Sequence, residues 1–343
     1  MCGFIGQVNF EKQSFEWIKE GLKAISHRGP DSSGTWISDC SRVALGHQRL
    51  SILDLSEKGN QPMNNKEFGL TIVFNGEIYN HKEIRKSLAN MGFNNWKGNS
   101  DTETILISFA ILGFEETLSK MIGMFSLLLH CKKSNKICLA RDRAGEKPLF
   151  YHLNNSCFIA SSELKAIFKN NKIKRDLSLS GFNSYLENGF VPGKNCILKD
   201  FKKLEPGHFA SLDINSGKLE IKRYWQLPKF QKLKSQNKNG IEFVEEIEYL
   251  LNQSVKNQLY ADVDVGVLLS GGVDSSLITA IASKYNKKLK TFTIKFDDKK
   301  FDESNHAKLI AEHFQTDHTE LKVQPSSIEI VELLSRQFDE PMV

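Results

Sequence analysis

The sequence predicts two domains of different class, a strand-rich α+β sandwich followed by an incomplete, doubly wound α/β parallel sheet. Two observations carry this prediction. Short apolar runs separated by Gly, Asn, Asp and Pro fill residues 2–212, whereas helix-like and strand-like patterns alternate from residue 241 onward. The length of 343 residues agrees with two domains, because single domains commonly have about 100–200 residues.

Six apolar runs in the first domain have the length of strands, and they lie at residues 4–8, 43–45, 70–74, 124–129, 137–140 and 158–160. Three further segments repeat apolar residues at helical spacing, at residues 81–91, 101–112 and 178–187. We expect these helices to cover the sheets that the strands form.

The second domain alternates helices with strands. Helices are expected at residues 241–258, 274–284, 303–314 and 327–338, and strands at 263–269, 289–296 and 318–322. Such alternation is typical of a parallel sheet that binds its ligand beyond the carboxyl ends of the strands. Only these three strands fit, so we expect the sheet to be incomplete.

A polar stretch at residues 229–240, with four lysines, indicates a connector between the domains. We therefore assign the first domain to residues 2–212, a linker to 213–240 and the second domain to 241–343.

The composition argues against several classes of protein. Apolar residues make up 40% of the chain and charged residues 25%, as in globular proteins. The net charge of +5 is spread along the sequence, so we expect no nucleic-acid partner. The six cysteines include no C-x-x-C pair, which argues against a zinc ribbon or a disulfide framework and favours the cytoplasm. No apolar run approaches the ~18 residues of a membrane span, so we expect no membrane association.

The strongest chemical signal is the segment SGGVDSS at residues 270–276, between an apolar run and a predicted helix. Glycines let a backbone close around an anion, and the N-terminus of a helix carries a partial positive charge. The predicted phosphate-binding residues are Ser270, Gly271, Gly272, Asp274, Ser275 and Ser276. Asp274 would hold Mg²⁺, because a carboxylate beside phosphate requires a cation between them. The alternative is a glycine turn followed by a helix cap.

Cys2 is the candidate nucleophile of the first domain. Removal of Met1 would leave a thiol and a free α-amine on the same residue. An α-amine has a pKa of about 7.7–8.0, so it can accept the proton of the thiol near neutral pH. Taken alone, a cysteine at position 2 can equally be structural.

Five motifs follow one another from the N-terminus, namely MCGFIG, HRGPDSSG, GHQRLSILD, FNGEIYN and GNSDTE, and together they resemble the class II glutamine amidotransferase domain. The glutamine chemistry that this resemblance implies would explain several polar residues that follow Cys2. Amide hydrolysis develops an oxyanion, to which the Asn75 side chain and the Gly76 backbone N–H can donate. Arg49 can bind the carboxylate of glutamine, and Asp101 with Glu77 can bind its ammonium. The alternatives are a surface ion pair for Arg49 and a hairpin turn at Asn75 and Gly76.

Four of the five motifs contain these residues. The resemblance implies an N-terminal-nucleophile hydrolase fold, which is an αββα sandwich, and it adds the backbone from Leu50 to Leu53 to the glutamine pocket.

The 270–276 loop resembles the pyrophosphate loop of N-type ATP pyrophosphatases, and the order of the two domains resembles glutamine-dependent asparagine synthetase. The resemblance implies ATP and Mg²⁺ as cofactors, with adenine contacts at Leu268 and Ile294. The small-molecule substrates would be L-aspartate, L-glutamine and ATP, and the products L-asparagine, L-glutamate, AMP and diphosphate.

That family continues well beyond the DEP motif at residues 339–341, so the chain resembles a C-terminally truncated member with an impaired synthetase step. Three alternatives stay open. The enzyme could amidate another carboxylate, such as one on a surface polysaccharide sugar. The chain could be a non-catalytic remnant. A homodimer or a separate C-terminal half could complete the second domain.

Overall fold

The computed structural model describes residues 1–11, 13–229, 240–323 and 329–342. These residues form two compact units, and each is described separately. One unit consists of Met1–Pro228 together with Ser335–Val343, and the other of Lys229–Leu334.

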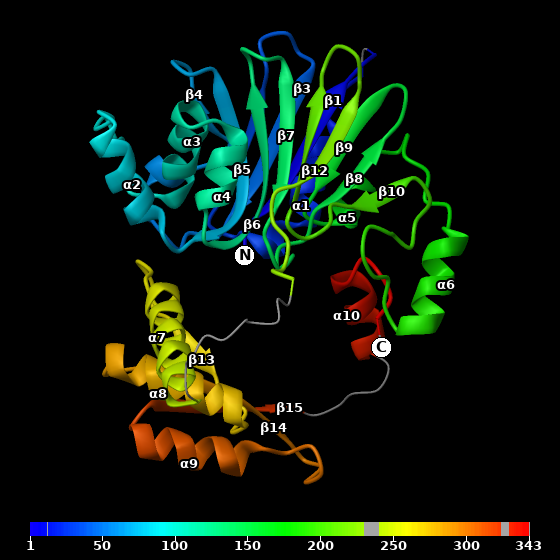
Figure 1. Cartoon of the computed structure of the whole chain (residues 1–343). Coiled ribbons are helices and arrows are strands. Elements are labelled where there is room, and N and C mark those ends of the chain that lie inside the picture. The colour runs from blue at the N-terminus through cyan, green and yellow to red at the C-terminus, as the bar shows by residue number, and fades with distance from the viewer. Residues whose placement is uncertain (12, 230–239, 324–328, 343) are drawn as a thin grey trace. The chain divides into compact units, whose positions relative to one another are not determined.

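The first unit is built on two six-stranded sheets (Figure 1), with strand orders β10-β8-β9-β1-β3-β2 and β12-β11-β7-β6-β5-β4. The strands of the first sheet are β1 (Gly3–Asn9), β2 (Ser32–Ile37), β3 (Val43–Arg49), β8 (Phe150–Leu153), β9 (Cys157–Ser161) and β10 (Phe201–Lys203). Those of the second are β4 (Met63–Asn65), β5 (Leu70–Ile78), β6 (Gly123–Cys131), β7 (Lys136–Arg141), β11 (His208–Asp213) and β12 (Leu219–Arg223).

Apolar side chains from both sheets meet between them, among them Phe4 and Leu45 from the first sheet and Leu128 and Leu139 from the second. Helices α1 (Trp17–Ala24) and α5 (Leu164–Ile167) pack on the first sheet. Helices α2 (His81–Asn90), α3 (Asp101–Ile111) and α4 (Phe114–Lys120) pack on the second. The predicted αββα sandwich is therefore confirmed. The unit also contains η1 (Ser26–Arg28), η2 (Glu57–Gly59) and α6 (Leu179–Asn188).

The second unit contains a parallel sheet in the order β13 (Gly266–Leu268), β14 (Lys290–Phe296) and β15 (Asp317–Val323). Helix α7 (Gly240–Gln258) precedes the sheet, and α8 (Val273–Tyr285) and α9 (Ser304–Phe314) connect its strands. Its buried apolar clusters are small, with four buried members in one and three in the other. The predicted alternation and the small parallel sheet are confirmed. Helix α10 (Glu329–Gln337) follows.

The predicted linker begins too early. Asp213 is the last residue of β11, and β12 pairs with β11 at the edge of the second sheet, so the first unit continues to Pro228. Strand β12 has the sequence LEIKR and is largely exposed. An edge strand needs few apolar residues, which is why the apolar pattern did not reveal it. The remainder of the predicted linker, at residues 230–239, lies outside the described residues. No helix in the described part of the chain is long and apolar enough to cross a membrane.

Candidate functional site

Cys2 directly precedes β1, and several contacts fix the start of this strand. The Arg28 guanidinium donates from Nε to the Cys2 carbonyl at 2.8 Å. The Phe4 backbone N–H donates to Ser162 Oγ at 3.1 Å, and the Ser161 hydroxyl donates to the Phe4 carbonyl at 2.9 Å. Strand β1 lies between β3 and β9, so the residue that carries the thiol is held at the end of a central strand.

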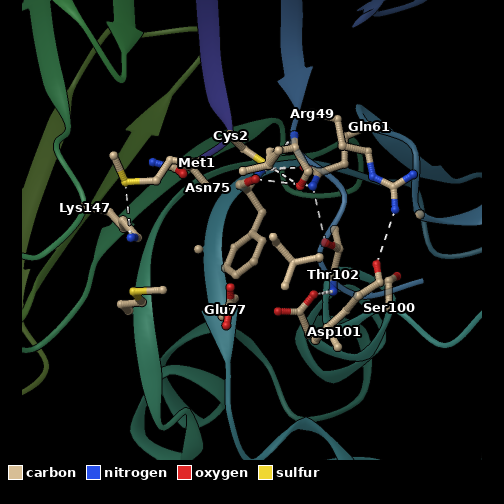
Figure 2. Close-up of a pocket in the computed structure, with 17 residues that line it drawn as sticks. Met1, Cys2, Arg49, Gln61, Asn75, Glu77, Ser100, Asp101, Thr102 and Lys147 are labelled. Atoms are coloured by element: carbon tan, nitrogen blue, oxygen red, sulfur yellow. Dashed lines mark hydrogen bonds between the residues drawn. The ribbon is translucent and has the colours of Figure 1, made fainter. Parts of the chain in front are cut away.

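All eight residues predicted for glutamine chemistry line one cavity of about 180 Å³ (Figure 2). They come from the start of β1, from β3 and the loop after it, from β5, and from the first turn of α3. These residues are Cys2, Arg49, Leu50, Leu53, Asn75, Gly76, Glu77 and Asp101. Segments far apart in the sequence therefore bring these eight residues together in one cavity.

The Cys2 thiol lies beside the Leu50 backbone. Its Sγ is 3.4 Å from the Leu50 N–H that donates to it, and 3.5 Å from the Leu50 carbonyl. Burial raises the pKa of the thiol. Met1 also lines the cavity, and burial lowers the pKa of its α-amine. A proton acceptor close to Cys2 would therefore be needed to form the thiolate at neutral pH.

Asn75 supplies an amide that has no hydrogen-bond partner among the described residues. The residue is 1% exposed, and neither Nδ2 nor Oδ1 is paired. Both Asn75 and Gly76 lie inside β5, so the alternative prediction of a hairpin turn there is wrong. A Cβ atom at Gly76 would collide with the Met124 carbonyl on the neighbouring strand, which explains the glycine. An orphaned buried amide carries a free-energy cost unless a ligand satisfies it.

Asp101 begins α3, whose N-cap is Ser100. Its Oδ2 accepts from the Ile78 N–H at 2.9 Å, and its Oδ1 accepts from the Thr102 N–H at 2.8 Å. Burial, with a smaller contribution from Glu77, raises the pKa of Asp101 to about 6 despite these hydrogen bonds. Burial also raises the pKa of Glu77. Two carboxyl groups in one small cavity favour a cationic ligand.

Arg49 lines the cavity, but its terminal nitrogens hold the loop that follows β3. Nη1 donates to the Ser56 carbonyl and to Asn60 Oδ1, both at 2.9 Å. Nη2 donates to the carbonyls of Leu53 and Asp54. The guanidinium is buried, so the alternative of a surface ion pair is wrong. A carboxylate ligand at Arg49 would have to compete with these carbonyls.

The cavity also contains residues that were not predicted as site residues, and two of them are polar side chains with contacts that bear on the site. Gln61 holds the strand before Asn75, because its Oε1 accepts from the Phe74 N–H at 2.7 Å and its Nε2 donates to the Phe74 carbonyl at 3.3 Å. Lys147 brings a buried ammonium within 3.5 Å of Met1 Sδ, and burial lowers its pKa. Lys147 lies in the stretch RDRAGEKPLFY at residues 141–151.

The second predicted site lies between β13 and α8. Ser275 Oγ accepts from the Ser270 N–H at 3.2 Å and lies 3.0 Å from Ser270 Oγ, so these side chains shape the loop. Gly271 has a φ of +84°, and a Cβ there would lie 2.6 Å from the Ala307 N atom of α9. Gly272 is the N-cap residue of α8, and a Cβ there would have only Ser270 Oγ nearby, at 3.4 Å. Ser276 Oγ is buried and has no partner among the described residues.

The remaining predicted nucleotide residues lie near this loop without forming a closed pocket. Leu268 is 81% exposed at the end of β13, and Ile294 is 50% exposed on β14. Asp274 is in the first turn of α8 and is exposed. Within the described ranges, no group of three or more His, Cys, Asp or Glu side chains could hold a metal ion. Asp274 would therefore need phosphate oxygens to complete a cation site.

Two family models match the chain, and they divide it in the same order as the structure. The model of a glutamine amidotransferase domain matches residues 1–225, and the model described as asparagine synthase matches residues 246–343. A Methanocaldococcus jannaschii protein, named provisionally as glutamine-hydrolysing asparagine synthetase 2, is 34% identical over 99% of this chain and 68% of its own length. The chain belongs to the glutamine-hydrolysing asparagine synthetase family.

Other matches agree with membership in the asparagine synthetase family. Glutamine-hydrolysing asparagine synthetase 1 of Bacillus subtilis is 34% identical over 90% of this chain and 48% of its own length. The chain thus spans about half to two thirds of these curated relatives. The solved structure of a B. subtilis glutamine phosphoribosylpyrophosphate amidotransferase, complexed with ADP and GMP, covers 96% of this chain and 70% of its own. Its TM-score is 0.50 at 14% identity, which indicates a shared fold alone.

Proposed function

We propose that the first unit hydrolyses glutamine to glutamate and ammonia, with Cys2 as the nucleophile. The observation that carries this proposal is the convergence in one cavity of a thiol, an unpaired amide and a buried carboxyl group, from Cys2, Asn75 and Asp101. A thiol supplies the nucleophile, an amide N–H stabilises an oxyanion, and a carboxylate binds an ammonium. Glutamine needs all three.

The proposed reaction begins with removal of Met1, which frees the α-amine of Cys2. This amine takes the thiol proton, and the sulfur attacks the side-chain carbonyl carbon of glutamine. Asn75 Nδ2 and the Gly76 backbone N–H donate to the oxyanion that forms. The carbonyl then re-forms, the C–N bond breaks, and the nitrogen leaves as ammonia with the proton from the amine. Water hydrolyses the thioester to glutamate and restores the thiol.

The ends of the bound amino acid would be held by the remaining residues of the cavity. Asp101 and Glu77 would receive its ammonium, since both carboxyl groups line the cavity. Arg49 and the backbone of Leu50 and Leu53 would receive its carboxylate. This arrangement would place the side-chain amide of glutamine beside Cys2.

We further propose that the loop after β13 binds the phosphates of ATP. Two features support the fit, namely the unpaired buried hydroxyl of Ser276 and the open space at Gly272. The groups that would donate to phosphate are in Ser270, Gly271, Gly272, Ser275 and Ser276. Asp274 would hold Mg²⁺, which neutralises phosphate charge when bound. Leu268 and Ile294 would contact the adenine.

For the whole protein we propose the reaction of L-aspartate, L-glutamine, ATP and water to L-asparagine, L-glutamate, AMP and diphosphate. The names of two relatives support aspartate as the acceptor. Adenylation would activate the aspartate carboxyl group, and ammonia from the first unit would displace AMP.

Labelling of the nucleophile tests the central step. Purified protein should begin at Cys2, react there with 6-diazo-5-oxo-norleucine, and release glutamate from glutamine. Cys2→Ala should abolish both labelling and glutamate release. Cys40→Ala is the matched control, because Cys40 is a free, exposed thiol outside the cavity. Labelling at Cys40 or another cysteine in place of Cys2 would contradict the proposal.

A further inference from the structure

Residues close to the end of the second family match contact the first unit. Ser335–Val343 belongs to the first unit by its contacts, although the asparagine synthase model extends over it. Two carboxylates anchor this segment. Asp339 accepts from the backbone N–H groups of Leu164 and Lys165, at 2.6 and 3.2 Å, and Glu340 accepts from the Ile197 N–H at 2.8 Å and from Lys203 Nζ at 2.8 Å.

Asp339 also begins a continuous chain of charged side chains. Its Oδ1 lies 3.3 Å from Lys165 Nζ, and the same ammonium donates to Glu163 Oε2 at 2.6 Å. Glu163 Oε1 accepts from Arg28 Nη1 at 2.7 Å and lies 3.3 Å from His27 Nε2. Arg28 Nε in turn donates to the Cys2 carbonyl at 2.8 Å. We call Asp339, Lys165, Glu163 and Arg28 the Asp339 chain.

The members of the Asp339 chain are poorly accessible to water. The side chains of Arg28, Glu163 and Asp339 are 7, 10 and 8% exposed, and that of Lys165 is 19% exposed. Burial alone would raise the pKa of Glu163, but hydrogen bonds from Lys165 and Arg28 lower it. Buried charged hydrogen bonds polarise one another, so a change at one end is felt along the network.

Residues 161–165, which include Glu163 and Lys165, also hold the backbone of β1. Ser161 and Ser162, which precede Glu163, bond to the Phe4 carbonyl and N–H. Asp339 binds the two N–H groups that follow Glu163. A shift of residues 161–165 would therefore move both the Arg28 contact and the strand that begins beside Cys2.

Resting on the glutaminase activity proposed above, we infer that Asp339 is a positioning residue for Cys2, acting through Lys165, Glu163 and Arg28. The rate of glutamine hydrolysis thus depends on a residue from the part of the chain that matches asparagine synthase. Asp339 does not line the glutamine cavity, so it sets the placement of the sulfur and leaves substrate binding unchanged.

The test compares two carboxylates that anchor the same segment. Asp339→Asn keeps an oxygen for one of the two backbone N–H groups and removes the charge that faces Lys165. We expect kcat for glutamate release to fall about three- to tenfold, since small misplacements of a reacting group lower rates steeply. The glutamine KM should stay within about twofold, and the rate of Cys2 alkylation by iodoacetamide should fall with kcat. Glu340→Gln, the matched control, should leave kcat within about twofold.

A double-mutant cycle distinguishes an effect of Asp339 that passes through Glu163 from a general loosening of the structure around Cys2. If Asp339 acts through Glu163, Glu163→Gln combined with Asp339→Asn should be no slower than Glu163→Gln alone. Lys165→Met removes the ammonium that links Asp339 to Glu163 and should reproduce the fall in kcat. This variant keeps the test decisive if Asp339→Asn folds poorly.

Several results would overturn the inference. One is an unchanged kcat in Asp339→Asn or Lys165→Met. Another is a fall in kcat in Glu340→Gln as large as that in Asp339→Asn. A third is a double mutant of Asp339 and Glu163 whose fall in kcat is the product of the two single falls. Wild-type protein that neither releases glutamate nor is labelled at Cys2 would refute the proposed function, and the inference with it. An active wild type with an unaffected Asp339→Asn variant would refute the inference alone.

Discussion

Ionisation of Asp101 should control glutamine binding. Burial raises the pKa of this carboxyl group from 3.8 to about 6, although two backbone N–H groups donate to it. A shift of about two units corresponds to about 3 kcal/mol, because each unit is worth about 1.4 kcal/mol. That free energy is the cost of keeping the charge buried without a cation. An ammonium from glutamine would supply the missing partner, so the ionised form should bind glutamine far more tightly.

The dissociation constant of glutamine should therefore rise as the pH falls through 6. With a pKa of about 6, the ionised fraction of Asp101 falls about tenfold between pH 7 and pH 5, and we expect a similar loss of affinity. Calorimetric titration of the Cys2→Ala variant measures binding without hydrolysis or thiol ionisation. Asp101→Asn in the same background should bind weakly at every pH. A dissociation constant that stays constant from pH 5 to pH 8 would refute this account of Asp101.

The same shift predicts a stability difference whose sign can be checked. The folded protein holds the Asp101 proton more tightly than the unfolded chain between pH 3.8 and about 6, so ionisation destabilises the fold as the pH rises across this window. Without glutamine, the free energy of unfolding of Asp101→Asn relative to that of the wild type should increase by up to about 3 kcal/mol as the pH rises from 4 to 7. Urea unfolding measures this difference. A wild type that gains stability over the variant with rising pH would contradict the shift.

Four other substitutions test the remaining roles. Arg49→Lys should raise the glutamine KM about tenfold or more through loss of the planar fork; an unchanged KM with a lower Tm would limit Arg49 to holding its loop. Asn75→Ala should lower kcat about 10²–10³-fold with little change in KM, and a tenfold change in KM alone would argue against the oxyanion role. Gly272→Ala should weaken binding of Mg²⁺–ATP without lowering the Tm, whereas Gly271→Ala should lower the Tm because its Cβ would meet α9; the reverse pattern would contradict our assignment of the loop.

Much of the fold could be predicted because the core strands are continuous apolar runs. Strands β1, β5 and β6 lie inside their sheets and are mostly buried, so most of their residues are apolar or small. The edge strands β2, β4, β10 and β12 and the interior strands β8 and β11 were not predicted. Strand β10 has three residues and β12 is largely exposed, so neither carries a repeating apolar pattern.

The members of the candidate site could be predicted, but the neighbours of each side chain could not. Arg49 illustrates the difference, because the carbonyls that it contacts belong to a loop whose path depends on Gly59, where a Cβ would collide with the guanidinium. Asn75 and Gly76 form a dipeptide that is common in hairpin turns, and only the continued pairing of β5 with β6 shows that the strand passes through them. Local sequence does not encode such long-range pairing.

The central place of β1 gives maturation an early interval before the first unit can fold. Strand β1 pairs with β9 through Ile5 and Ser161, partners that are 156 residues apart in the chain. At a synthesis rate of about 5–20 residues per second, the ribosome needs about 8–30 s to synthesise the residues of β9 after those of β1. During that interval the N-terminus remains accessible to a methionine aminopeptidase. Once the sandwich closes, Met1 lines the cavity with its α-amine partly buried. We therefore expect removal of Met1 to begin on the nascent chain. In the folded protein Met1 is still 58% exposed, so its later removal would be opposed only by the partial burial of its α-amine.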